Sequence, residues 1–231
     1  MDVRRRRLVQ ATMALPVALA CPALSHGASA PRAGVRAFLT EGEYRFITAA
    51  TARLIPGNAD DPGAIEADIP RFIDLQLAGF YGRADRWYME GPWAAGTPQQ
   101  GYQLQQTPAQ LYRLAIAGID AHCRAQYDGH VFAELSAEQQ DQCLRDLEAG
   151  KIELRDIPAK AFFQVLWQNT QEGFLADPMY GGNRNFTGWK LIGFPGPRYN
   201  YVEEITQYGQ PYPLPPVGIL GRDGTRIQAG A

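Results

Sequence analysis

The sequence predicts a mainly α-helical fold, in which a compact helical domain precedes a long irregular segment rich in glycine, proline and aromatic residues. Three stretches place Ser or Thr three residues before Glu or Gln, the spacing of a helix capping box, and apolar residues then recur at a helical period. These stretches begin at Thr40, Thr107 and Ser136. After Phe174 the periodicity fades and Gly, Pro, Asn and Tyr dominate, which predicts irregular structure over residues 174–231.

Two helices are expected ahead of a long insertion. The first follows the capping box at Thr40 and ends before Pro56, because a residue that precedes proline avoids the helical region. A polar loop over residues 57–63 leads to the second helix, which we predict over residues 68–82, with Pro70 in its first turn. The apolar residues of this second helix span a wide arc, so we expect them to be deeply buried. They are Phe72, Ile73, Leu75, Leu77 and Phe80.

The insertion covers residues 81–106 and shows no helical period. Loops of this length are usually functional or disordered, but the many aromatic residues argue against disorder. We expect these aromatic side chains to be covered, either by this domain or by a partner. They are Trp87, Tyr88, Trp93 and Tyr102.

Further helices are predicted from Thr107 to the Asp128-Gly129 pair, over residues 136–150, and from Pro158 to about Gly173. In the irregular segment, short helices are predicted over residues 188–192 and 201–205, and an extended polyproline stretch over residues 211–216.

The N-terminus carries four arginines, Arg4 to Arg7, followed by a soft apolar stretch and then small residues. This order is typical of a twin-arginine (Tat) export signal, which we place at residues 1–30 with Arg5 and Arg6 as its arginine pair. Residues 31–231 would then form a single domain exported, already folded, to the periplasm. The signal could be cleaved after residue 25, 27 or 30, and the sequence does not decide among these three sites. The alternative is a basic tail beside a short buried helix; a membrane span is disfavoured because residues 8–24 are short and hold two prolines.

The charge of the chain argues against a nucleic-acid partner. The net charge is −2, and removal of residues 1–30, which hold four arginines and one aspartate, would make it about −5. No basic stripe follows the signal.

Cys123 and Cys143 are the two cysteines that follow residue 30. Both fall on predicted helices, and an oxidising compartment would permit a disulfide between them. Two buried thiols that act as small apolar residues are an equal alternative. A bond to a partner subunit is the third.

The sequence lacks the usual motifs of cofactor and catalytic sites. It has no dinucleotide or phosphate loop, no C-x-x-C-H haem motif and no G-x-S-x-G elbow. His122 and His130 do not have the spacing of a helical metal pair. We therefore expect no cofactor, metal or catalytic residue in this chain. Glu172 and Asp177 could serve as acid and base of a hydrolase, although Asp177 precedes a proline and suits a turn.

The stretch of the sequence that most strongly indicates a functional region is a loop over residues 180–196, which is rich in glycine and aromatic residues. Several glycines in a short span indicate positive φ angles or close approach of the backbone to another group. From these residues alone, a ligand pocket, a docking face and an ordinary packed loop all stay open. The residues that we select as interface candidates are Tyr180, Gly181, Gly182, Asn183, Trp189, Phe194 and Gly196.

The same residues carry a resemblance to a known family. Glu172-Gly173-Phe174, Asp177-Pro178, Tyr180-Gly181-Gly182-Asn183, Gly188-Trp189 and the stretch Ile192 to Gly196 together resemble the third, small subunit of gluconate 2-dehydrogenase. Residues 54–56 and 61–64 resemble the first loop of that family.

The resemblance implies a place in a larger assembly. Complexes of this kind have an FAD subunit that oxidises a sugar or sugar acid, and a multihaem cytochrome c subunit that passes electrons to membrane quinones. The small subunit binds the FAD subunit, has no redox centre and can carry that partner through the Tat translocase. FAD and haem c are therefore expected in the partners, which would also hold this chain at the membrane. The alternatives are a stand-alone periplasmic hydrolase and a periplasmic binding or structural protein.

Overall fold

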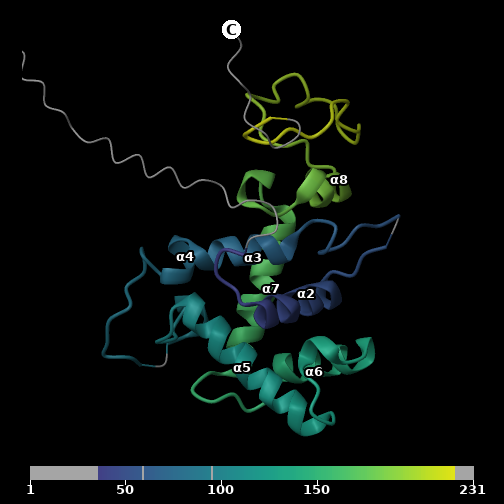
Figure 1. Cartoon of the computed structure of the whole chain (residues 1–231). Helices are drawn as coiled ribbons and strands as arrows, with labels where there is room; N and C mark the ends of the chain where they lie inside the picture. The colour runs from purple at the N-terminus through teal and green to yellow at the C-terminus, as the bar shows by residue number, and fades with distance from the viewer. Residues whose placement is uncertain (1–35, 59, 95, 222–231) are drawn as a thin grey trace, which may run out of the picture. The chain divides into compact units, whose positions relative to one another are not determined.

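The computed structural model describes residues 36–58, 60–94 and 96–221, and within them it is mainly α-helical (Figure 1). The predicted fold class is thus confirmed. The signal at residues 1–30, with Arg5 and Arg6, lies outside the described residues. In the described part, strand pairing is limited to two isolated bridges, Leu154–Ile157 and Gly218–Gly221. The α-helices there are α2 (Glu41–Leu54), α3 (Ile69–Ala78), α4 (Phe80–Arg83), α5 (Pro108–Gln126), α6 (Ala137–Ala149), α7 (Ala159–Leu175) and α8 (Thr187–Ile192).

The three predicted capping boxes are present and begin α2, α5 and α6. At the start of α2, the Glu43 backbone N–H donates to Thr40 Oγ1 at 3.3 Å, and the Thr40 N–H donates to the Glu43 carboxylate at 2.8 Å. The same reciprocal pairs join Thr107 to Gln110 and Ser136 to Gln139. Each box satisfies N–H groups that the first turn of a helix leaves without partners.

The helix predicted over residues 68–82 is instead two helices that meet at Gly79. This glycine is extended, with φ −92° and ψ −160°, so it ends α3 and precedes α4. The Arg83 guanidinium donates to the Ala78 carbonyl at 2.9 Å, which satisfies the end of α3. The break also corrects the expected burial of Phe80, whose side chain is 66% exposed. Arg83 and Arg86 lie over its ring, at 5.5 and 5.7 Å from the centroid.

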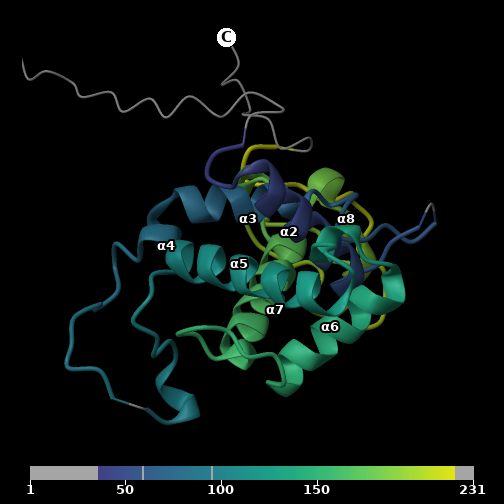
Figure 2. The same cartoon turned by 60° about the horizontal axis from the view of Figure 1, so that its bottom comes forward.

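The hydrophobic core is built around α7, which contacts α2, α3, α5, α6 and α8. Figures 1 and 2 both show α7 in the midst of these helices. The largest fully buried side chains come from α2, α3, α5, α6 and α7 and from the turn before α6. They include Phe46, Ile73, Tyr112, Phe132, Leu147 and Phe162.

Two buried polar groups fasten this core. Asn169 on α7 donates to the hydroxyls of Tyr112 and Tyr81, at 2.9 and 3.0 Å, and so links α7 to α5 and α4. On α3, the Asp74 carboxylate is 2% exposed and accepts the backbone N–H groups of residues 37, 38 and 39 at 2.6 to 2.9 Å. The segment before α2 is thereby held against α3.

Within the described residues, the irregular C-terminal segment adds almost no apolar side chains to the main core. Among the described residues, the apolar side chains in or against the main core all come from Ala176 or earlier. The segment instead forms a second, small aromatic cluster of Phe186, Trp189 and Phe194 next to α8. Figure 1 shows the last described residues, in yellow, beside α8. The helix predicted over residues 188–192 is confirmed as part of α8, but residues 201–205 form turns.

None of the helices in the described part of the chain is long and apolar enough to cross a membrane.

Candidate functional site

The loop that carries the candidate residues is held against the end of α7 by Asn183. Its side chain is fully buried and its backbone is left-handed, with φ 47°. The amide nitrogen Nδ2 donates to the Ala176 carbonyl, and Oδ1 accepts the Gly188 backbone N–H, both at 2.8 Å. Asn183 therefore joins the residue that directly follows α7 to the first turn of α8.

Two glycines let the loop lie directly on α7. A Cβ at Gly182 would lie well under 3.0 Å from the Gly173 carbonyl oxygen, and a Cβ at Gly188 would do the same at the Phe174 carbonyl oxygen. Both contacts are with backbone, which cannot move aside. The close approach expected from the glycine pattern is therefore present, and Gly181 and Gly196 supply the positive φ angles, 97° and 81°.

Trp189 belongs to the inside of this loop. It is 4% exposed, and its indole Nε1 donates to the Leu175 carbonyl at 2.7 Å. Its ring stacks on Phe186 at 5.5 Å and meets the edge of Phe194 at 4.9 Å. Trp189 thus binds α8 to the end of α7 and does not offer its face to a partner.

Of the seven candidate residues, only Tyr180 and Phe194 present a largely exposed side chain, 48% and 40% respectively. Gly182, Asn183, Trp189 and Gly196 are buried, so they shape the loop from within. Sequence reasoning missed the apolar residues beside them that do face outward. These are Leu175, Met179, Leu191 and Ile192. Residues 189–192 are four consecutive apolar or amphipathic residues, and a short helix cannot bury all four on one face. This pattern could have predicted that some of them face outward.

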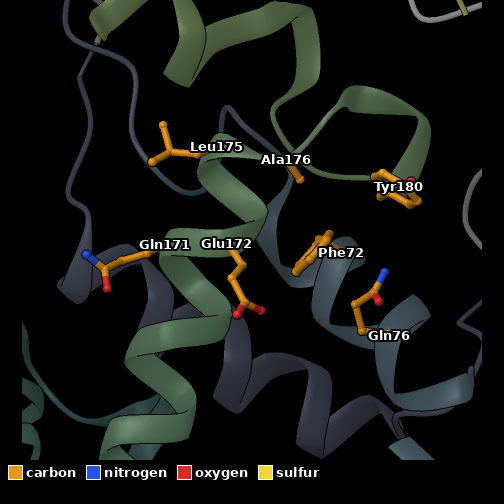
Figure 3. A pocket seen from close by; sticks show the side chains of 7 residues that line it. All are labelled: Phe72, Gln76, Gln171, Glu172, Leu175, Ala176 and Tyr180. Atoms are coloured by element: carbon orange, nitrogen blue, oxygen red, sulfur yellow. The ribbon is translucent and has the colours of Figure 1, made fainter. Parts of the chain in front are cut away.

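Tyr180 lines an open groove of about 620 Å³ between α3 and α7 (Figure 3). Phe72 and Gln76 come from α3, and Gln171, Glu172, Leu175 and Ala176 come from the C-terminal end of α7 and the residue after it. The lining is mostly apolar, with Glu172 as its one charged residue. Such a surface suits an apolar side chain of another protein better than acid–base chemistry.

Glu172 and Asp177 are not brought together in that groove. The exposed Glu172 carboxylate lines it and accepts from the Gln168 side chain at 2.7 Å. Asp177 is 8% exposed and is absent from the groove lining. Its two carboxylate oxygens accept the backbone N–H groups of Met179 and Ile219, at 3.0 and 2.7 Å. Asp177 therefore fastens the C-terminal segment, in keeping with the turn role that its Pro neighbour favours.

The structure brings Cys123 on α5 and Cys143 on α6 together. Both side chains are buried, and their sulfur atoms lie 4.0 Å apart as unbonded thiols. The hydrogen bond with Cys123, and then burial, raise the pKa of the Cys143 thiol. The two sulfurs are thus neighbours, whereas a bond between them stays a prediction. Their burial makes a bond to a partner subunit the least accessible of the three alternatives.

The insertion over residues 81–106 is partly covered by its own domain. Trp87 packs between Tyr81 and Tyr102, at 5.7 and 5.0 Å between ring centroids, and the Tyr102 hydroxyl donates to the Gln106 carbonyl at 2.7 Å. Tyr88 is 81% exposed. Within the described residues, no three His, Cys, Asp or Glu side chains gather as metal ligands would.

A comparison with protein families identifies the family of this chain. A model for the family described as gluconate 2-dehydrogenase subunit 3 matches residues 41–196. The match covers more than half of the chain, so the chain belongs to this family, and the resemblance noted in the sequence is confirmed. Family membership implies a multi-subunit dehydrogenase complex. Neither the comparison with curated proteins nor the comparison with solved structures found a match.

Proposed function

We propose that this chain is the accessory, non-redox small subunit of a periplasmic, membrane-associated dehydrogenase complex that oxidises a sugar or sugar acid such as gluconate. In this proposal it binds the FAD subunit and aids its folded export, while FAD and haem c belong to the partner subunits.

The observation that carries the proposal is the exposed apolar surface around the loop that matches the family. Six large apolar side chains at or just after the ends of α7 and α8 are each at least 40% exposed: Leu175, Met179, Tyr180, Leu191, Ile192 and Phe194. Monomeric proteins seldom display so many large apolar side chains from one short stretch, and such surfaces are typical of docking sites. The rigid framework of Asn183 and Trp189 would hold these side chains in place, which lowers the entropy lost on binding.

A co-purification experiment tests the binding step. The chain would be co-expressed with its flavin subunit, isolated from a periplasmic extract, and scanned for flavin absorbance. We expect Tyr180→Ala combined with Phe194→Ala to weaken retention of the flavin subunit at least tenfold. Leu114→Ala on α5 is the matched control, because Leu114 is also exposed, at 49%, but lies away from the loop in the sequence. Trp189→Ala is a poor test, since it removes internal packing.

The result that overturns the proposal is equally direct. If the purified chain turns over a substrate without any flavoprotein, or if it retains no flavin subunit at all, the accessory role is wrong.

The export step has its own test. Replacement of the pair by Arg5→Lys with Arg6→Lys should leave both the chain and the flavin subunit in the cytoplasm, since a Tat signal requires its arginines. Fractionation with immunoblotting of both subunits measures this. Normal periplasmic levels of the flavin subunit would show that it travels independently.

A further inference from the structure

Residues 198–216 form a loop that leaves the domain and returns to the same place; we name it the arm. At its base the Val217 backbone N–H donates to the Pro195 carbonyl at 3.2 Å. Gly196 lies so close to the Val217 carbonyl that no side chain would fit between them. Just beyond, Asp177 accepts the Ile219 N–H at 2.7 Å. The two ends of the arm therefore contact each other beside α8.

The interior of the arm is held by polar and ring contacts. The Tyr201 hydroxyl donates to the Gly196 carbonyl at 2.6 Å, and the Arg198 guanidinium donates to the Pro215 carbonyl at 2.5 Å. The ring of Tyr212 lies 5.8 Å from the ring of Tyr201 and 5.3 Å from the Arg198 guanidinium carbon. These contacts give the arm a shape that does not depend on burying its other apolar side chains.

Those other side chains point outward. Val202, Ile205 and Tyr208 are 67%, 63% and 85% exposed, and Leu214 is 51% exposed. Because the contacts above hold the arm without their burial, these side chains leave apolar area available for a second protein.

The charges of the arm favour one kind of partner. Its charged residues are Arg198, Glu203 and Glu204. Arg198 is engaged within the arm by Pro215 and Tyr212, whereas neither glutamate forms an ion pair with any residue that the structure describes. Two free carboxylates beside apolar side chains complement a groove rimmed by lysine or arginine. They oppose binding to an anionic lipid surface.

We propose that the arm docks into an apolar groove rimmed by basic side chains on the flavin subunit, as a second contact separate from the loop around Tyr180. This inference rests on the proposed function and deepens it. The arm follows Gly196, where the match to the family ends. The family model thus leaves the arm unmatched, and in this proposal the arm contributes to the choice of partner.

Two arm variants test the proposal with the flavin subunit as the probe. Val202→Ala with Ile205→Ala removes apolar area, and Glu203→Lys with Glu204→Lys reverses the charge. We expect each to raise the Kd for the purified flavin subunit at least tenfold, and the charge reversal to remove most of the salt dependence of binding. The matched controls are Leu114→Ala and Glu153→Lys, which change an exposed apolar and an exposed acidic residue elsewhere and should leave the Kd within twofold.

The outcomes separate the two proposals. If the unmodified chain binds the flavin subunit and the Tyr180 and Phe194 variant weakens it, but both arm variants bind within twofold of the unmodified chain, the arm proposal fails and the proposed function stands. If the unmodified chain does not bind at all, both fail. Arm variants that keep flavin-subunit binding but lose binding to the cytochrome subunit, to phosphatidylglycerol vesicles or to a second copy of this chain would overturn the assigned occupant.

Discussion

The helical domain formed by α2 to α7 and the segment after it, residues 176–221, are stabilised in different ways. The helical domain buries its apolar residues in one continuous core. The later segment is held by hydrogen bonds to the side chains of Asn183, Trp189 and Asp177, by close backbone contacts at glycines, and by a small aromatic cluster next to α8. Of the eighteen large hydrophobic side chains that the structure shows as exposed, eleven come from residues 176–221.

The helical domain is therefore the stabilising part of the molecule, and residues 176–221 are the displaying part, which presents exposed apolar side chains. Burial of apolar area supplies most of the free energy of folding, so the helical domain can maintain its own structure. A segment fixed by hydrogen bonds and one small aromatic cluster leaves most of its other large apolar side chains exposed. The comparison predicts that substitutions will act on folding when they touch the attachment between the two parts, and on binding when they touch the outer face of the second.

The largest expected effect is at the attachment itself. Gly188→Ala would place a Cβ against the Phe174 carbonyl oxygen, where neither backbone can yield. We expect the free energy of unfolding to fall by about 4 kcal/mol, in the exceptional range for a single substitution. Hydrogen exchange should show lost protection over residues 176–196 with α2 and α5 still protected.

The matched control is Gly42→Ala. Gly42 lies in α2 with nothing within 4 Å of a Cβ, so alanine should raise stability by up to about 1 kcal/mol. Unchanged protection over residues 176–196 in Gly188→Ala would contradict the attachment that we describe.

The second prediction concerns the helical domain alone. If the chain is exported as proposed, protein isolated from the periplasm should carry a disulfide between Cys123 and Cys143, formed by exchange with a periplasmic disulfide oxidant that takes up the two thiol protons and the electron pair. A loop of about 20 residues closed in this way should stabilise the fold by about 3 kcal/mol through the unfolded state. Thermal melting with and without reductant measures the effect.

Cys143→Ala supplies the control, because its melting temperature should not respond to reductant. Quantitative thiol labelling of the denatured periplasmic protein provides an independent reading: two labels per chain would mean that the pair stays reduced.

The third prediction is a loss of stability at alkaline pH from the buried tyrosine hydroxyls that Asn169 of α7 contacts. Burial raises the pKa of Tyr81 to about 12, against 10 in the unfolded chain. The unfolded state therefore releases this proton first, so the contribution is complete below pH 10 and is lost as the pH rises from about 10 to 12. The full loss is about 2.7 kcal/mol for two pKa units.

Tyr81→Phe should flatten, without abolishing, the fall in unfolding free energy above pH 10, because burial also raises the pKa of Tyr112. Tyr88→Phe, at a residue that is 81% exposed, should leave the slope of unfolding free energy against pH unchanged. Equal slopes for all three proteins in urea titrations at pH 9 to 11.5 would show that Tyr81 ionises freely.

Local patterns in the sequence were sufficient for most of the helical domain. Capping boxes depend on residues three apart, so the starts of α2, α5 and α6 could be predicted from Thr40, Thr107 and Ser136. The break at Gly79 could not, because a glycine within an apolar period is tolerated in many helices. The end of α3 is visible only in the structure, in the extended backbone of Gly79 and the hydrogen bond from Arg83 to the Ala78 carbonyl.

Close backbone approach in this loop could be predicted from the sequence, but the face that the loop turns outward could not. The glycines and Trp189 marked the loop correctly as a place of close approach, yet which face looks outward depends on contacts with α7. The Asn183 bonds to residues 176 and 188, and the contact from Asp177 to Ile219 across 42 residues, follow from the fold and have no local signature.

The smallest expected effect on stability is at the arm. Val202→Ala with Ile205→Ala should change the free energy of unfolding by no more than about 0.5 kcal/mol, since both side chains are more than 60% exposed and little apolar area leaves the folded state. Ile47→Ala in α2, where the side chain is fully buried, should cost about 2–5 kcal/mol in the same urea titration. A fall above 1.5 kcal/mol in the arm variant would mean that these side chains support the fold, and the division between a stabilising and a displaying part would then fail at the arm.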